Sequence, residues 1–147
     1  MTPIASPDEL SPGMTFDLGR FVLPRAEVLD FAGRYDPQPF HLDEEAAKDS
    51  LFGRLVASGL HTYSAAVGHL IRSGLLSRIS QGGGAAEISW PAPLDPDTWV
   101  TMRIEVEEIR ISRSRPDLAI ARLRYLVATE QAGTVVLDVY ATHFLRR

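Results

Sequence analysis

An aspartate and a histidine that could act on one water molecule stand five residues apart within residues 35–41. Pro37 and Pro39 stiffen this stretch, because each proline fixes its own φ at about −65° and biases the preceding residue toward extended geometry. Asp36 and His41 are therefore presented from a restricted backbone. A carboxylate and an imidazole that meet in a cleft can exchange protons with one water, as hydration or hydrolysis requires. The same spacing also fits a solvated turn without chemistry.

The elements on either side of this stretch follow from residue spacing. Residues 15–22 alternate between apolar and polar side chains, which predicts a first strand. A helix should begin at Pro24, which suits a first helical turn, and end at Pro37. Asp43 fits the N-cap of a short helix that runs to about residue 48. The Asp36 and His41 pair is thus expected on the loop between two helices.

A longer helix is predicted over residues 59–76. Apolar residues recur there at helical spacing and form one stripe: Leu60, Tyr63, Val67, Leu70, Ile71 and Gly74. The other faces carry small residues, so we expect surrounding structure to bury this helix on nearly all sides. Gly59 lies near its N-terminus, where unpaired N–H groups and the helix dipole favour an anion.

The chain changes character at residues 81–84, where three consecutive glycines predict a flexible break. A short alternating run ends before Pro91, and longer runs follow around residues 100–106, 121–127 and 135–141. We expect these four runs to form a meander of strands with one dry face. With the early helices, this predicts an α+β layout in which an antiparallel sheet wraps around the long helix.

Composition narrows the class of protein. The 147 residues are 45% hydrophobic and 23% charged, as in one globular domain, so we expect a single domain over 1–147 with an irregular lead-in over 1–13. The net charge of −4 argues against a nucleic-acid partner. The chain has no cysteine, which excludes disulfides and thiolate chemistry. Neither a signal peptide nor an apolar run of about 20 residues is present, so we expect a cytoplasmic protein without a membrane partner.

Three blocks of the sequence together resemble the MaoC-like dehydratases, the (R)-specific enoyl-CoA hydratase branch of the hotdog fold. The family motif of an Asp followed by x-Asn-Pro-x-His reads here Asp36-Pro37-Gln38-Pro39-Phe40-His41. The block that opens the central helix reads Leu55-Val56-Ala57-Ser58-Gly59-Leu60-His61-Thr62. A strand and a proline-rich turn over residues 88–97 complete the likeness, which runs from about Thr15 to the C-terminus.

The resemblance implies a fold and an activity. It implies a hotdog fold in which Asp36 and His41 hold a water against an α,β-unsaturated acyl-CoA thioester and act as the catalytic acid and base. The backbone N–H of Gly59 would stabilise the thioester oxygen. Ser58 and Gln38 are expected beside it at the substrate; Gln38 stands where the family usually has Asn, and Ser58 where many members have His. A homodimer or higher homo-oligomer is expected, with no cofactor and no metal.

Two other functions fit the same fold. A hotdog thioesterase would hydrolyse the acyl-CoA thioester, and a non-catalytic subunit would bind an acyl group without turnover. His61, His69 and His143 are interpreted as structural, because no paired ligand lies near them in the sequence. Arg110, Arg113 and Arg115 could contact the phosphates of coenzyme A or form a solvated hairpin.

Overall fold

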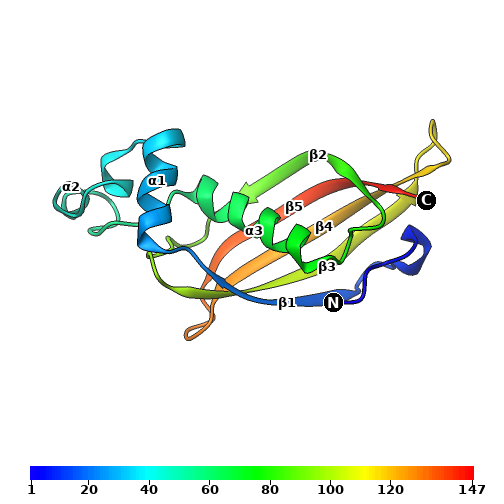
Figure 1. Cartoon of the computed structure of the whole chain (residues 1–147), viewed down its shortest axis with the longest axis horizontal. Coiled ribbons are helices and arrows are strands. Elements are labelled where there is room, and N and C mark those ends of the chain that lie inside the picture. The colour runs from blue at the N-terminus through cyan, green and yellow to red at the C-terminus, as the bar shows by residue number, and fades with distance from the viewer.

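The computed structural model describes residues 1–147 and contains one five-stranded sheet (Figure 1). The strands are β1 (Thr15–Val22), β2 (Ser80–Ser89), β3 (Trp99–Ile111), β4 (Leu118–Thr129) and β5 (Val135–Arg146). All neighbouring strands are antiparallel, in the order β1-β3-β4-β5-β2. The predicted α+β class is therefore confirmed, and β1 has the predicted bounds.

Three α-helices lie between β1 and β2 in the chain. They are α1 (Arg25–Tyr35), α2 (Glu44–Lys48) and α3 (Gly59–Ser73), with short 3₁₀ turns at Pro7–Glu9 and Pro39–His41. Figure 1 shows α1 and α2 gathered at one end of the sheet, while α3 runs along it. The Asp43 side chain accepts a hydrogen bond from the N–H of Ala46, which confirms it as the cap of α2. None of the helices combines the length and apolarity needed to cross a bilayer.

The dry face of the sheet carries the core, as the alternation of the sequence predicts. Every second residue is buried along the first half of β3 and along β4: Val100, Met102, Ile104, Val106, Ala119, Ala121, Leu123, Tyr125 and Val127. Ile4 and Leu10 of the N-terminal lead-in also belong to this core. Each buried aliphatic side chain contributes about 1.5–3 kcal/mol, so this layer holds the sheet to the helices and fixes the site above it.

Two predictions about β2 are wrong. Residues 81–84 are not a flexible break but part of β2, and Gly82 takes a φ of 127° at an irregular point of the ladder. The four later strands also do not form a simple meander, because β2 pairs with β5 instead of β3. Almost all of β2 is exposed at the sheet edge, so burial does not alternate along it, and the short alternating run before Pro91 marks only its last residues in the sequence.

The predicted buried stripe of α3 is also wrong in part. Leu60 and Ile71 are 45% and 56% exposed. Of the predicted stripe only Leu70 is buried, and the other buried residues of the helix are His61, Thr62 and Ala66. Within this chain α3 is therefore left uncovered on the side that carries Leu60, Ser64 and Ile71. The helix ends at Ser73 because Gly74 adopts the left-handed conformation that favours glycine, with φ 76°.

Two polar side chains lie within the core and bond to each other. Burial raises the pKa of the Tyr125 hydroxyl and lowers the pKa of the His143 imidazole, so both side chains are held neutral. The Tyr125 hydroxyl and His143 Nε2 form a hydrogen bond with each other. This contact satisfies two groups that would otherwise cost free energy in an apolar layer.

Acid should destabilise the protein through its buried histidines. Burial lowers the pKa of His143 and His61 below the ordinary 6.5. The unfolded chain therefore binds more protons than the folded chain below about pH 6.5, and the free energy of unfolding falls as pH falls. Urea unfolding should give a lower value at about pH 5.5 than at about pH 7.5. The His143→Gln variant, whose side-chain amide can replace Nε2 in the hydrogen bond with Tyr125, should lose less unfolding free energy between these two pH values. An unchanged loss would contradict this origin.

Candidate active site

Asp36 and His41 meet because two prolines turn the chain after α1. Asp36 is the residue at which α1 ends, and the 3₁₀ turn Pro39–His41 brings the histidine back beside it. Asp36 Oδ2 and His41 Nε2 lie 3.3 Å apart. The side chains are 18% and 6% exposed, so the pair is largely shielded from bulk solvent.

A backbone carbonyl fixes the histidine ring. His41 Nδ1 lies 2.7 Å from the carbonyl oxygen of Val56. A carbonyl can only accept, so Nδ1 carries the hydrogen, and Nε2 faces Asp36. The edge of the ring packs on Phe40, with centroids 4.5 Å apart at 70°. The ring therefore cannot turn without breaking a buried contact.

Two further donors hold the carboxylate of Asp36. Gln38 Nε2 donates to Oδ1 at 2.8 Å, and Ser58 Oγ donates to Oδ2 at 2.7 Å. Burial by itself raises the pKa of Asp36, but the hydrogen bonds from Ser58 and Gln38 and the charge of His41 outweigh it. The pKa of Asp36 therefore lies below its ordinary 3.8, and the group is an ionised base at neutral pH.

The N-terminus of α3 lies beside this pair. Ser58 is the N-cap residue, but its hydroxyl is bonded to Asp36 and does not cap the helix. The carbonyl of Ser58 accepts from His61 and Thr62, while the N–H groups of Gly59 and Leu60 have no acceptor within the chain. Free N–H groups at the positive end of a helix can bind a developing oxyanion.

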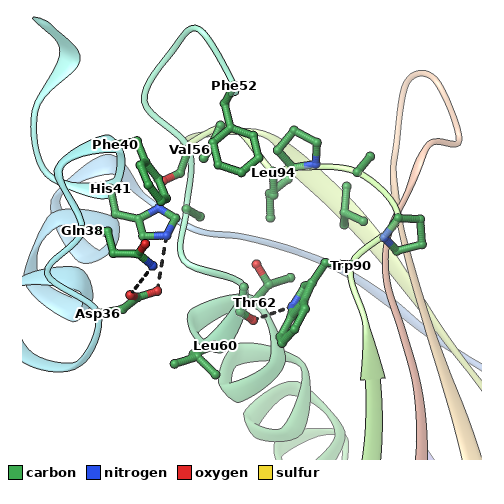
Figure 2. Close-up of a pocket in the computed structure, with 16 residues that line it drawn as sticks. Asp36, Gln38, Phe40, His41, Phe52, Val56, Leu60, Thr62, Trp90 and Leu94 are labelled. Atoms are coloured by element: carbon green, nitrogen blue, oxygen red, sulfur yellow. Dashed lines mark hydrogen bonds and ion pairs between the residues drawn. The ribbon is translucent and has the colours of Figure 1, made fainter. Parts of the chain in front are cut away.

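These groups border one cavity of about 440 Å³ (Figure 2). Figure 2 shows Asp36, Gln38 and His41 on one side and Trp90 on the other, with the first turn of α3 between them. The remaining wall is mostly apolar: Phe40, Phe52, Val56, Ala57, Leu60, Thr62, Pro91, Ala92, Pro93, Leu94 and Val136. Four of the residues predicted at the site, Asp36, His41, Gly59 and Gln38, line this cavity. Ser58 is fully buried and lies behind Asp36.

Two contributors to the site carry no signal in the sequence. The Val56 carbonyl that orients His41 is a backbone group. The Trp90 indole N–H donates to the carbonyl of Gly59 at 2.8 Å, which joins residues 31 positions apart. Only the proline-rich turn after Trp90 marked this region as unusual.

The other candidates for chemistry lie away from the pair. His61 stacks on Phe31 with centroids 4.6 Å apart, and His69 bonds to the carbonyl of Leu18. The hairpin between β3 and β4, with its arginines, lies at the end of the sheet opposite α1 and α2, and Arg115 pairs there with Asp117 (Figure 1). That hairpin therefore does not reach the cavity of its own chain. No cluster of three or more His, Cys, Asp or Glu side chains could hold a metal ion.

Comparison with known proteins agrees with this geometry. A MaoC-like dehydratase from Rhodospirillum rubrum has a solved structure that is similar to this chain with a TM-score of 0.88, 42% identity and 95% coverage of both chains. The R-hydratase PhaJ1 from Pseudomonas aeruginosa shares the fold, with a TM-score of 0.75 and 18% identity over 97% of this chain and 86% of that one. These neighbours confirm the hotdog fold.

Sequence comparison points the same way. The Bacillus subtilis (strain 168) protein YdeM is 29% identical over 100 residues, which cover 67% of this chain and 71% of YdeM. The family profile described as "MaoC like domain" matches residues 6–125, which include Asp36, His41 and Gly59. The chain therefore belongs to the MaoC-like dehydratase family.

Proposed function

We propose that this protein is an (R)-specific hydratase of enoyl thioesters, which adds water to an α,β-unsaturated acyl-CoA or removes it in reverse. The observation that carries the proposal is the 3.3 Å contact between Asp36 Oδ2 and His41 Nε2 at the cavity that α3 opens onto. The R stereochemistry is what the resemblance to the (R)-specific branch implies, and the R-hydratase from Pseudomonas aeruginosa shares the fold. Membership in the family supports hydration or dehydration in general, whereas the enoyl-CoA substrate is our proposal.

In the proposed reaction the water oxygen bonds to the β-carbon while Asp36 accepts one of its protons. Asp36 suits this role because it is ionised and two donors fix its oxygens. The electron pair of the double bond moves onto the thioester as an enolate. His41 enters this step with a proton on Nε2 as well as on Nδ1 and delivers the Nε2 proton to the α-carbon. The proton on Asp36 then passes across the 3.3 Å contact to the empty Nε2 of His41. The sum of these steps adds one water, and both side chains return to their starting state.

The enolate charge requires a donor at the thioester oxygen. The free N–H groups of Gly59 and Leu60 are available at the positive end of α3. A donor fixed by the fold needs no reorganisation during the reaction, and one such donor typically contributes about 2.7–4 kcal/mol to transition-state stabilisation. The apolar wall of the cavity excludes water and strengthens this interaction.

Ser58 and Gln38 act on Asp36 in this proposal. The resemblance placed both at the substrate, but each donates to a different oxygen of the carboxylate. We assign them as positioning residues that keep Asp36 ionised and oriented. Gln38 also lines the cavity, so a contact with substrate remains part of its proposed role.

Replacing Ser58 with Ala should move the acid limb of the pH–rate profile to higher pH. The Ser58 hydroxyl is the strongest of the contacts that lower the pKa of Asp36, and its loss leaves the raising effect of burial less opposed. The measurement is kcat/KM against pH for wild type and variant. Ser64→Ala, an exposed change on the same helix, is the control and should leave the limb in place. An acid limb that coincides for all three proteins would contradict the assignment.

The function is tested by assaying a panel of enoyl-CoA thioesters in two ways at once. Loss of the absorbance of the conjugated thioester reports hydration, and a thiol-trapping reagent reports hydrolysis. We expect loss of absorbance without free thiol, and chiral analysis of the product should give the R isomer. Release of thiol would indicate a thioesterase, and binding without either signal would indicate a non-catalytic acyl-binding subunit.

We also propose that the protein is a homodimer that pairs through β2. This strand lies at an edge of the sheet with nearly all its residues exposed, and such an edge readily pairs with another chain. Light scattering should give about twice the chain mass of 16.2 kDa. A charge in the exposed strand, as in Ala86→Lys, should shift the mass toward that of one chain. A wild-type mass of one chain would contradict the proposal.

A further inference from the structure

Trp90 lies where the end of β2 meets the beginning of α3. It follows the last residue of β2 directly and precedes Pro91, which restricts the backbone on its other side. Its indole is 44% exposed and forms part of the cavity wall, opposite Asp36 and His41 (Figure 2). The residue therefore contacts both the cavity and the helix that opens onto it.

The indole occupies the space of the side chain that Gly59 lacks. A Cβ atom built on Gly59 would lie 2.5 Å from both Nε1 and Cε2 of Trp90. Contacts this short do not occur between real side chains, and an indole held by a hydrogen bond and a neighbouring proline cannot yield cheaply. The φ of Gly59 is not in the left-handed region, so close approach is the reason for glycine at this position.

The hydrogen bond of Trp90 acts on a defined peptide group. The indole N–H donates to the carbonyl of Gly59 at 2.8 Å, and that carbonyl shares its planar peptide unit with the N–H of Leu60. Fixing the carbonyl therefore also fixes the direction of the Leu60 N–H. Donation to the carbonyl polarises the peptide and makes its N–H a stronger donor. Both Gly59 and Leu60 have N–H groups without an acceptor in the chain.

We infer that Trp90 is a positioning residue for the anion-binding end of α3. It clamps the peptide between Gly59 and Leu60 so that the Leu60 N–H is held ready, beside the free N–H of Gly59, for the thioester oxygen as the enolate forms. This inference rests on the proposed hydration and names a residue in it beyond Asp36, His41 and Gly59. It assigns Trp90 no part in proton transfer.

Three variants distinguish a role of Trp90 in fixing the Gly59–Leu60 peptide from a role as part of the cavity wall alone. Trp90→Phe retains an aromatic ring but loses the N–H donor, and Trp90→Leu loses both. Trp99→Phe is the control, because Trp99 is also 44% exposed and lies under Arg20, outside the cavity that holds Asp36. Each protein is first checked for an unchanged unfolding temperature within a few degrees.

We expect Trp90→Phe to lower kcat by about 10-fold or more, with KM changed by less than about 3-fold, because the lost interaction acts mainly on the transition state. Trp90→Leu should be at least as impaired, and Trp99→Phe should match wild type. The acid limb of the pH–rate profile should stay in place for Trp90→Phe, unlike for Ser58→Ala. A rise in KM with kcat intact, or a shifted acid limb, would overturn the inference.

A second measurement needs no turnover and therefore separates this inference from the proposed reaction. In NMR spectra of the full chain, unreactive butyryl-CoA should move the amide protons of Gly59 and Leu60 downfield in wild type and in Trp99→Phe. The shift of the Leu60 amide proton should be much smaller in Trp90→Phe. Equal shifts in Trp90→Phe would overturn the clamp even if hydration is observed. If no enoyl thioester is hydrated but the difference in shifts persists, the clamp stands and the proposed reaction fails.

Discussion

Replacing Asp36 with Asn should lower kcat for enoyl-CoA hydration by about 10²- to 10⁴-fold, the usual contribution of a positioned acid–base group. The amide has nearly the shape of the carboxylate and leaves the fold in place, but it cannot accept a proton from water. Its NH₂ group cannot accept a hydrogen bond, so either Ser58 or Gln38 loses its acceptor, and the loss of kcat should lie toward the upper end. Steady-state rates on a substrate that wild type hydrates give the measurement.

The matched control is Asp30→Asn on the same helix. Asp30 forms an exposed ion pair with Arg34, with side chains 65% and 66% exposed, and such pairs contribute at most about 1 kcal/mol to stability. This variant should keep wild-type kcat. An Asp36→Asn protein as active as Asp30→Asn would show that the carboxylate takes no part in the reaction.

Replacing Gly59 with Ala should be nearly as damaging, by about 10²- to 10³-fold in kcat. The new methyl group would lie 2.5 Å from the indole of Trp90, so either the tryptophan or the first turn of α3 must move. Both movements displace the N–H groups that the proposal places at the thioester oxygen. The rate and the thermal unfolding temperature are measured together to separate lost catalysis from lost folding.

Gly33→Ala provides the control for this substitution. Gly33 lies in α1 with no atom within 4 Å of an added Cβ, so alanine fits there without strain. Alanine in a helix should stabilise the protein by about 0.5–1 kcal/mol relative to glycine and leave kcat unchanged. If Gly59→Ala behaves like Gly33→Ala, the close packing of Trp90 has no functional consequence.

Local signals in the sequence predict much of the fold. The alternation of Val100, Met102, Ile104 and Val106 marks β3 because one face of that strand is dry. Pro37 ends α1 and Asp43 caps α2 through the backbone restrictions and hydrogen bonds that these residue types make. Each of these signals acts within a few residues along the chain.

The errors arise where distant segments decide the outcome. Residues 81–84 form a strand only because β5 supplies the hydrogen bonds. Three of these residues are glycines, which have no side chains and therefore leave no alternating pattern that would predict a strand. The buried face of α3 is set by how closely the helix can approach the sheet, so Ala66 is buried while Ile71 is not. Periodicity finds an apolar stripe but cannot tell which face meets the sheet.

The contacts of the candidate site also divide into those between residues near in the sequence and those between distant segments. Asp36 and His41 lie on one short turn, so they can meet, but their spacing also fits a solvated turn, and the prediction of a shared site rests on the resemblance over three blocks of the sequence. The hydrogen bond from Ser58 to Asp36 spans 22 residues, and the one from Trp90 to Gly59 spans 31. Such pairs depend on how α3 and the end of β2 are placed by the whole sheet. No local pattern predicts them.

The most direct test of the proposed hydration is to incubate the protein with crotonyl-CoA in water labelled with ¹⁸O and to analyse the intact thioester by mass spectrometry. We expect a 3-hydroxybutyryl-CoA that carries the label on its β-carbon, formed by wild type and nearly absent with Asp36→Asn. Label found instead in a free carboxylic acid, or unchanged crotonyl-CoA after incubation with wild type, would contradict the proposed hydration.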